Sequence, residues 1–169
     1  MENVGTVYLL CGLPGSGKTT WAKMKRDASP DSTIVINRDA LRSMVTGGKY
    51  VFNGVIEPVI RGMTENILGG ILYDSMEFDI VVDETNITKK KRAEWMDVVP
   101  AHVDVVCVWF TEAERNLDHR MTEPRGYPRE KWAGVIASMK EAFETPAKEE
   151  GFIEIEKVDV VHGIESRKA

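Results

Sequence analysis

The apolar run 7-VYLLC-11 leads directly into the glycine-rich stretch 12-GLPGSGKT-19. This stretch matches the pattern G-x-x-x-x-G-K-[ST], in which glycines allow backbone N–H groups to turn inward onto phosphate oxygens. A helix expected over residues 17–27 directs the positive end of its dipole toward the same anion. A strand before the loop and a helix after it are the context that the pattern requires. The sequence therefore predicts a nucleotide phosphate site at residues 12–19.

Each polar side chain of this loop has an expected role. We expect Lys18 to reach the β and γ phosphates of a nucleoside triphosphate, and the Thr19 hydroxyl to bind Mg²⁺. The whole expected donor-nucleotide site comprises Gly12, Pro14, Gly15, Ser16, Gly17, Lys18, Thr19 and Thr20.

Short apolar runs alternate with helical patterns along the rest of the chain. The runs expected to be strands cover 7–11, 33–37, 80–84, 103–110 and, more weakly, 153–161. Val- and Ile-rich strands separated by helices indicate parallel βαβ units with a sheet covered on both faces. The chain is therefore predicted to be one α/β domain over residues 1–169, with about five parallel strands and a short lid. Its class is that of P-loop NTPases of the nucleoside-monophosphate-kinase kind.

Two further helices are expected, at residues 55–72 and 130–143. In the first, Pro58 indicates a start or a kink near Glu57. A stripe of apolar residues is expected to form its buried face: Val55, Val59, Met63, Ile67 and Ile71.

Composition limits the cellular compartment and the kinds of partner that we expect. No apolar run approaches the roughly 20 residues needed to cross a bilayer, and we expect no membrane association. Cys11 and Cys107 both lie in apolar runs, which suits buried thiols in a reducing cytoplasm. A net charge of −5 argues against nonspecific coating of nucleic acid, but 23-KMKR-26 and 89-KKKR-92 are candidates for a local basic groove. The alternative is that these runs are solvated helix faces.

The stretch 37-NRDALR-42 follows the second strand, at the end of the sheet where ligands collect. Asp39 could accept the proton of an attacking hydroxyl, and Arg42, at i+3, could hold an acceptor anion. The competing interpretation is that Asp39 caps a helix while Arg42 pairs with a surface acid.

Asp83 ends the third strand, where a carboxylate can hold Mg²⁺ through water. Thr85 and Asn86 follow it as neutral groups that could face a phosphate or nucleoside. Asp83 could instead cap the helix that begins near residue 88. Glu84 is expected to point elsewhere, because side chains alternate along a strand.

An arginine-rich stretch follows the fourth strand, and we expect a lid at roughly 112–131. Arg125, beside Gly126, suits a mobile loop that swings an arginine over the γ-phosphate, and Arg120 is the second choice. Nearby acids could equally pair with these charges at the surface.

Three classes of protein use such a phosphate loop: kinases, switch GTPases and mechanical ATPases. The chain lacks the Asn/Thr-Lys-x-Asp motif of a GTPase, and a mechanical ATPase generally needs a longer chain. A small kinase needs an acceptor base, a carboxylate that organises Mg²⁺ and a cationic lid, and all three have candidates here.

The motifs GLPGSGKTTW, INRDALR, VVDETN with KKKR, and EPRGYP occur in the order and spacing seen in polynucleotide 5′-hydroxyl kinases of the phage and bacterial type. The resemblance covers residues 4–155. It implies transfer of the γ-phosphate of ATP, or another nucleoside triphosphate, with Mg²⁺ to the 5′-hydroxyl end of DNA or RNA, as in nucleic acid repair. The segment 145-TPAKEEGF-152 resembles a turn that lies near the nucleobase in this family.

The resemblance also implies roles for individual residues. Asp39 is the general base, and Arg42 holds the acceptor phosphate beside the reacting nucleotide. Asp83, Thr85 and Asn86 surround the acceptor and metal, and Arg125 or Arg120 belongs to the lid. Some members have their acid one position later, where this chain has Glu84.

Many members carry an additional phosphatase or ligase domain. No Asp-x-Asp-x-Thr phosphatase motif occurs in this sequence, so we expect a stand-alone kinase. Two alternatives remain open: a small-molecule or aminoacyl-tRNA kinase on the same scaffold, and a regulator that hydrolyses ATP slowly and acts through a partner.

Overall fold

The computed structural model describes residues 5–48, 52–74, 77–111 and 129–159. Within them, five parallel strands form one sheet in the order β2-β3-β1-β4-β5. The strands are β1 (Val7–Cys11), β2 (Thr33–Asn37), β3 (Asp79–Asp83), β4 (Val105–Phe110) and β5 (Glu154–Val158). The predicted α/β fold with a five-stranded parallel sheet is confirmed.

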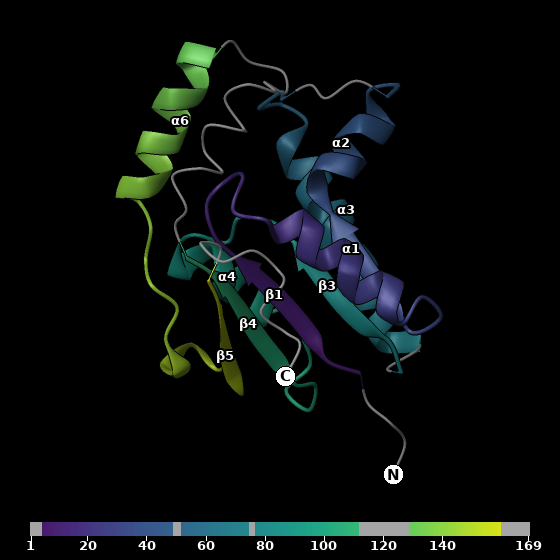
Figure 1. The fold of residues 1–169 in the computed structure, drawn as a ribbon. Helices are drawn as coiled ribbons and strands as arrows, with labels where there is room; N and C mark the ends of the chain where they lie inside the picture. Colours follow the sequence, from purple (N-terminus) through teal and green to yellow (C-terminus); the bar gives the residue numbers. More distant parts are fainter. Residues whose placement is uncertain (1–4, 49–51, 75–76, 112–128, 160–169) are drawn as a thin grey trace.

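Helices connect the strands on both sides of the sheet (Figure 1). They are α1 (Lys18–Ala28), α2 (Arg38–Val45), α3 (Glu57–Asp74), α4 (Lys89–Met96), α6 (Arg129–Glu141) and the 3₁₀ turn η1 (Lys148–Glu150). The helices predicted at 17–27 and 130–143 agree with α1 and α6 to within two residues at each end. Figure 1 shows α6 toward the β5 edge of the sheet, whereas α2 and α3 lie toward the opposite edge.

Two apolar clusters bury the two faces of the sheet. On one face, Leu68 and Leu72 of α3 and Trp95 of α4 pack against inward side chains of β1, β3 and β4. On the other face, Trp21 and Ala22 of α1 pack against the alternate side chains of the same strands. Because successive side chains of a strand point to opposite faces, a strand covered on both sides is apolar throughout, as the sequence of β1 indicates.

The buried face of α3 differs from the predicted stripe. Val55 and Val59 are 83% and 62% exposed, whereas the buried residues of the helix are Ile60, Thr64, Leu68 and Leu72. Positions 59, 63, 67 and 71 form one i, i+4 row, and positions 60, 64, 68 and 72 form the adjacent row. Both rows are largely apolar, so periodicity alone could not decide between them, and the prediction of the first row was wrong. The predicted start near Glu57 is confirmed.

Both cysteines are buried free thiols, as the sequence indicates. No helix in the described part of the chain is long and apolar enough to span a bilayer.

Since all five strands are parallel, their carboxyl ends meet at one edge of the sheet. β1 lies between β3 and β4, and β2 is the edge strand beside β3. The segments that follow β1, β2 and β3 therefore meet at this edge, and they contain the candidate site residues.

Candidate active site

The phosphate loop occupies the turn from β1 into α1, and its glycines are required by its geometry. Gly15 and Gly17 have φ values of 82° and 93°, in the left-handed region that favours glycine. A Cβ on Gly12 would lie 2.9 Å from both the Phe110 Cβ and the Ser16 Oγ. The loop therefore has the tight backbone path that its sequence predicts.

Lys18 lies inside this loop. Its Nζ donates to the carbonyl oxygens of Gly12 at 2.9 Å and Leu13 at 2.6 Å, and the residue is only 7% exposed. The ammonium is thus held at the centre of the loop, where it can exchange backbone oxygens for phosphate oxygens.

Residues after β3 hold the start of the phosphate loop in place. The Gly12 N–H donates to the Thr85 carbonyl at 2.9 Å. Asn86 is 2% exposed, and its side chain donates to the Leu10 carbonyl and accepts from the Trp95 indole. Its backbone has a φ of 43°, which asparagine tolerates better than most residues. The Asn86 side chain therefore points into the interior. The contacts of Thr85 and Asn86 in this structure support the phosphate loop.

The last residue of 89-KKKR-92 is fully buried. Arg92 forms a paired contact with Glu150, with Nε to Oε2 at 2.7 Å and Nη2 to Oε1 at 2.9 Å, and donates from Nη1 to the Asn86 carbonyl at 3.0 Å. Burial opposes ionisation of Glu150, but hydrogen bonds from Arg92 and the Ala147 amide hold its pKa below the ordinary value. Neither interpretation of this run foresaw an internal arginine.

This contact extends the support to residues 144–150. Glu150 is the last residue of η1, within the segment that resembles the nucleobase turn. Glu144 adds two contacts to the same region, with its N–H donating to the Ile87 carbonyl and its carboxylate accepting from the Lys89 amide. The segment is therefore fixed to the residues that also hold the phosphate loop.

Asn37, not Asp39, caps α2. The Asn37 side chain accepts from the Ala40 N–H at 2.8 Å, as is typical of an N-cap. Asp39 lies in the first turn of the helix with its side chain 38% exposed. The capping alternative for Asp39 is thereby removed.

Arg42 lies between two carboxylates. It donates from Nη1 to Asp39 at 2.5 Å and forms a two-bond contact with Glu57 of α3, each bond 2.6 Å long. Arg42 is 8% exposed, and its hydrogen bonds are the main cause that lowers the pKa of Glu57. The guanidinium therefore links Asp39 to the start of α3, a contact between residues 15 apart that the sequence pattern does not reveal.

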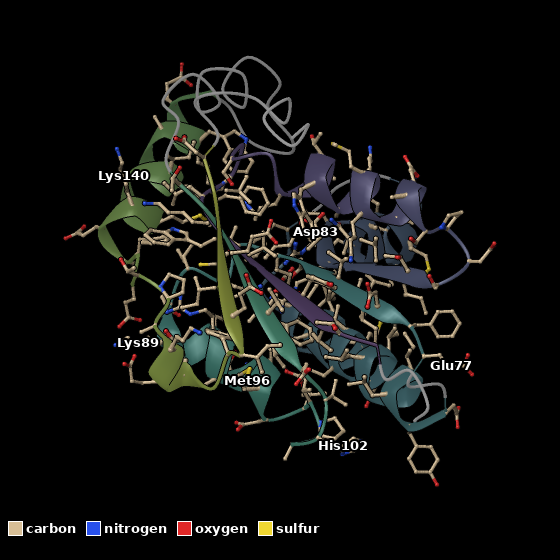
Figure 2. The ribbon with its side chains drawn as sticks, turned by 60° about the horizontal axis from the view of Figure 1, so that its bottom comes forward. Glu77, Asp83, Lys89, Met96, His102 and Lys140 are labelled. Atoms are coloured by element: carbon tan, nitrogen blue, oxygen red, sulfur yellow. The ribbon has the colours of Figure 1, made fainter. Side chains whose placement is uncertain are left out.

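Asp83 is 6% exposed and accepts from the Asn37 amide at 2.6 Å. The two residues are also register partners at the ends of β3 and β2. Thr88, not Asp83, caps α4, since its side chain accepts from the Lys91 N–H. Figure 2 shows Asp83 in the middle of the molecule, whereas Lys89 and Lys140 lie toward its edge.

Glu84 points away from Asp83, as alternation along the strand predicts. Its side chain, 9% exposed, forms an ion pair with Arg38 at 2.8 Å. Burial raises the pKa of Glu84 to about 7, despite the opposing attraction of Arg38 and Arg42.

A pocket of about 590 Å³ brings several of these residues together. Thr19, Asp39 and Asp83 all contribute to its lining, as does Asn37, the register partner of Asp83. One helix wall is a stripe of α1 that comprises Thr19, Ala22, Lys23 and Arg26, and the facing part of α2 comprises Asp39, Ala40 and Ser43. Arg42, although adjacent to Asp39, is not part of the lining.

The donor set in this pocket suits Mg²⁺. A carboxylate and a hydroxyl are hard oxygen ligands, and magnesium commonly keeps several waters besides one or two such protein ligands. No group of three or more His, Cys, Asp or Glu side chains arranged for a metal occurs among the described residues. Thr19 and Asp83 therefore fit a magnesium ion shared with nucleotide phosphates better than a site built from protein ligands alone.

The predicted lid arginines, Arg120 and Arg125, lie outside the described residues. Their assignment stays a prediction.

A sequence model described as the AAA domain matches residues 7–146, which is most of the chain. The chain belongs to this AAA domain family. Among curated proteins, it is 25% identical over 155 residues to the bifunctional polynucleotide phosphatase/kinase of Schizosaccharomyces pombe, which covers 90% of this chain and 33% of that protein. It is 28% identical over 145 residues to the L-seryl-tRNA(Sec) kinase of Methanococcus maripaludis, which covers 83% of this chain and 53% of that protein.

This AAA domain chain thus spans between a third and about half of the length of these two relatives. Among solved structures, it resembles a chain of the Pnkp1/Rnl/Hen1 RNA repair complex, with a TM-score of 0.63, 22% identity, and coverage of 85% of this chain and 48% of that one. It also resembles the Mycobacterium tuberculosis APS kinase CysC bound to AMPPNP and APS, with a TM-score of 0.58, 19% identity, and coverage of 91% and 88%. These likenesses show a P-loop kinase fold.

Proposed function

We propose that this chain is a polynucleotide 5′-hydroxyl kinase that transfers the γ-phosphate of ATP, with Mg²⁺, to the 5′-hydroxyl end of DNA or RNA. The observation that carries the proposal is that Asp39 lines the same pocket as Thr19 and Asp83. A candidate base for an acceptor hydroxyl thereby faces the residues expected at the phosphates of the donor. The motif resemblance and the match to a polynucleotide phosphatase/kinase support the choice of acceptor.

In the proposed reaction, the 5′-oxygen of the acceptor attacks the γ-phosphorus in line with the bond to the β,γ-bridging oxygen. The new P–O bond forms as the old one breaks, ADP leaves, and the hydroxyl proton passes to the Asp39 carboxylate. Since such transition states are loose, orientation of the hydroxyl by Asp39 contributes alongside its basicity.

The surrounding residues have distinct proposed roles. Lys18 binds the β and γ phosphates from inside the loop, and Arg42 positions the Asp39 carboxylate through the contact between them. Thr19 and Asp83 hold Mg²⁺, which supplies charge neutralisation to the transferring phosphoryl group. Arg120 and Arg125 are the proposed lid residues.

A second candidate is a kinase that acts on an aminoacyl-tRNA, and the match to L-seryl-tRNA(Sec) kinase favours it specifically. Both candidates involve a hydroxyl acceptor and use Asp39 in the same way. They differ in whether the reacting oxygen belongs to a nucleic acid end or to a seryl group.

Transfer of label from γ-labelled ATP separates these functions. The protein is incubated with Mg²⁺ and a 5′-hydroxyl oligonucleotide, the same oligonucleotide with a 5′-phosphate, or seryl-tRNA. We expect label only in the 5′-hydroxyl oligonucleotide. Label in seryl-tRNA alone establishes the second candidate, and hydrolysis that ignores all three acceptors contradicts both.

A further inference from the structure

The basic tetrapeptide 23-KMKR-26 divides its charges between two sides of α1. Lys25 forms an ion pair with Asp79 at 2.8 Å and lies over the Tyr8 ring. Lys23 and Arg26 instead line the pocket that contains Asp39 and Asp83. One cation of this run is therefore used within the fold, and two face the proposed acceptor space.

The two pocket cations continue a line that begins at the phosphate loop. Thr19, Lys23 and Arg26 lie on one stripe of α1, with spacings of four and three residues. A rise of about 1.5 Å per residue places Lys23 about 6 Å and Arg26 about 10 Å along the axis from Thr19. Lys23 and Arg26 thus lie away from the residues expected to react, along α1. An acceptor strand that leads away from its reacting 5′ end along this helix would pass both cations.

The charges of the two pocket walls are unequal. The α2 wall contributes small neutral side chains, Ala40 and Ser43, beyond Asp39. The α1 wall contributes both pocket cations, although the whole protein has a net charge of −5. The acids among the lining residues are Asp39 and Asp83, both placed at the proposed reaction centre. Beyond them, a polyanion that enters this pocket meets favourable charge along α1 and neutral side chains on α2.

The arginine expected to hold the acceptor phosphate is engaged elsewhere. Arg42 contacts Asp39 and makes a two-bond contact with Glu57, and it is absent from the pocket lining. Lys23 is exposed, and no ion pair of its side chain occurs within the part of the chain that the structure describes. Among the described residues, Arg26 is paired only with its exposed neighbour Asp27, a contact of the kind that contributes little to stability.

We propose that Lys23, assisted by Arg26, binds the phosphodiester backbone of the acceptor strand, while Arg42 positions Asp39. This inference rests on the proposed function and identifies the part of the site that distinguishes a polynucleotide from a nucleoside. A nucleoside carries the reacting hydroxyl but has no backbone phosphate for Lys23.

The test compares Lys23→Gln with Lys23→Arg and with a matched charge-removing control, Lys90→Gln. Lys90 is an exposed residue of α4, which packs on the opposite face of the sheet from α1. The kcat/KM is measured with 5′-hydroxyl oligonucleotides and with a nucleoside lacking phosphate. Affinity for a fluorescently labelled 5′-hydroxyl oligonucleotide is measured separately by anisotropy in the presence of ADP.

Lys23→Gln is expected to lower kcat/KM and affinity for the oligonucleotide about fivefold, as loss of one solvent-accessible ion pair would. The dependence of log affinity on log salt concentration is expected to become less steep by about 0.7, the value for one contact with a single strand. Lys23→Arg is expected to restore kcat/KM, affinity and salt dependence, and Lys90→Gln to leave all three unchanged.

Equal losses for the oligonucleotide and the nucleoside would overturn the inference, as would an unchanged salt dependence. Failure of the wild-type protein to bind the oligonucleotide would overturn both proposals. If the oligonucleotide binds but accepts no phosphate, the proposed function fails, while the effect of Lys23→Gln on binding still decides the inference.

Discussion

Asn37 and Asp83 are register partners on adjacent strands, and the Asn37 amide donates to the Asp83 carboxylate at 2.6 Å. The same Asn37 side chain caps α2 through its oxygen, so one amide connects the proposed metal ligand to the helix that holds the proposed base. The relative position of Asp83 and Asp39 therefore depends on this one side chain, which itself lines the pocket.

Replacement of Asn37 by Ala should affect both stability and metal use. Loss of the cap is expected to lower the free energy of unfolding by about 1 kcal/mol, and loss of the amide should raise the Mg²⁺ concentration needed for half-maximal activity. Thr88→Ala is the control, because it removes the cap of α4 but no contact to Asp83. Chemical denaturation and Mg²⁺ titration measure the two effects. Equal Mg²⁺ requirements in the two variants would contradict a positioning role for Asn37.

Asp39→Asn tests the proposed base with little change in shape. We expect the rate of phosphoryl transfer to fall by about 10²–10⁴, while stabilisation of the protein by ATP, read from the melting temperature, is retained. Asp97→Asn, which alters an exposed acid just after the end of α4, should keep the wild-type rate. Near-normal transfer by Asp39→Asn would show that another group accepts the proton.

Gly12→Ala should disrupt the phosphate loop, since its Cβ would lie 2.9 Å from two side-chain atoms. We expect loss of the ATP-dependent rise in melting temperature. Gly62→Ala in α3 is the control, because no atom lies within 4 Å of a Cβ there. That helical substitution should keep ATP binding and stabilise the protein by up to about 1 kcal/mol. Normal ATP binding by Gly12→Ala would contradict the tight loop.

Arg92→Met should be strongly destabilising, because it leaves the Glu150 carboxylate without its paired cation. We expect a loss of about 3–5 kcal/mol in the free energy of unfolding. Arg61→Met is the comparison. Arg61 contacts two acids, Glu65 and Glu94, but its side chain is 36% exposed, so its loss should cost about 1 kcal/mol or less. Urea denaturation distinguishes the two. Similar losses would contradict a special role for the buried pair.

The same pair gives a pH dependence of defined sign. The folded-state pKa of Glu150 lies below its ordinary value of 4.5. The stabilisation that the Arg92–Glu150 pair gives the folded state is therefore complete above the ordinary pKa of 4.5. It is lost as the pH falls through the lowered folded-state pKa of Glu150. In acid denaturation below pH 4.5, the wild-type protein should lose more stability than Arg92→Met. Parallel curves would show that the pair does not contribute this pH dependence.

Local sequence patterns were sufficient for the phosphate loop and the sheet. Residues 12–19 carry their own glycine spacing, and the bounds predicted for β1 and β2 agree with the structure. The position of Asp39 and Asp83 at one sheet edge followed from parallel topology.

Contacts between distant residues could not be read in this way. Two adjacent rows of α3 are largely apolar, and which of them is buried depends on where the sheet meets the helix. Arg92 and Glu150 are 58 positions apart, and nothing in the tetrapeptide 89-KKKR-92 distinguishes its one internal cation from its three lysines. Glu57 was recognised as a helix start but not as the partner of Arg42, because that contact depends on how α2 packs on α3.

The buried thiols provide an internal reporter of how the domain opens. Cys11, immediately before the phosphate loop, and Cys107, on β4, are both 0% exposed. A thiol reagent can reach them only when β1 or β4 separates from its covering elements, so the labelling rate measures the frequency of that opening. A nucleotide bound at the adjacent loop should slow labelling by mass action, whether or not any acceptor is present.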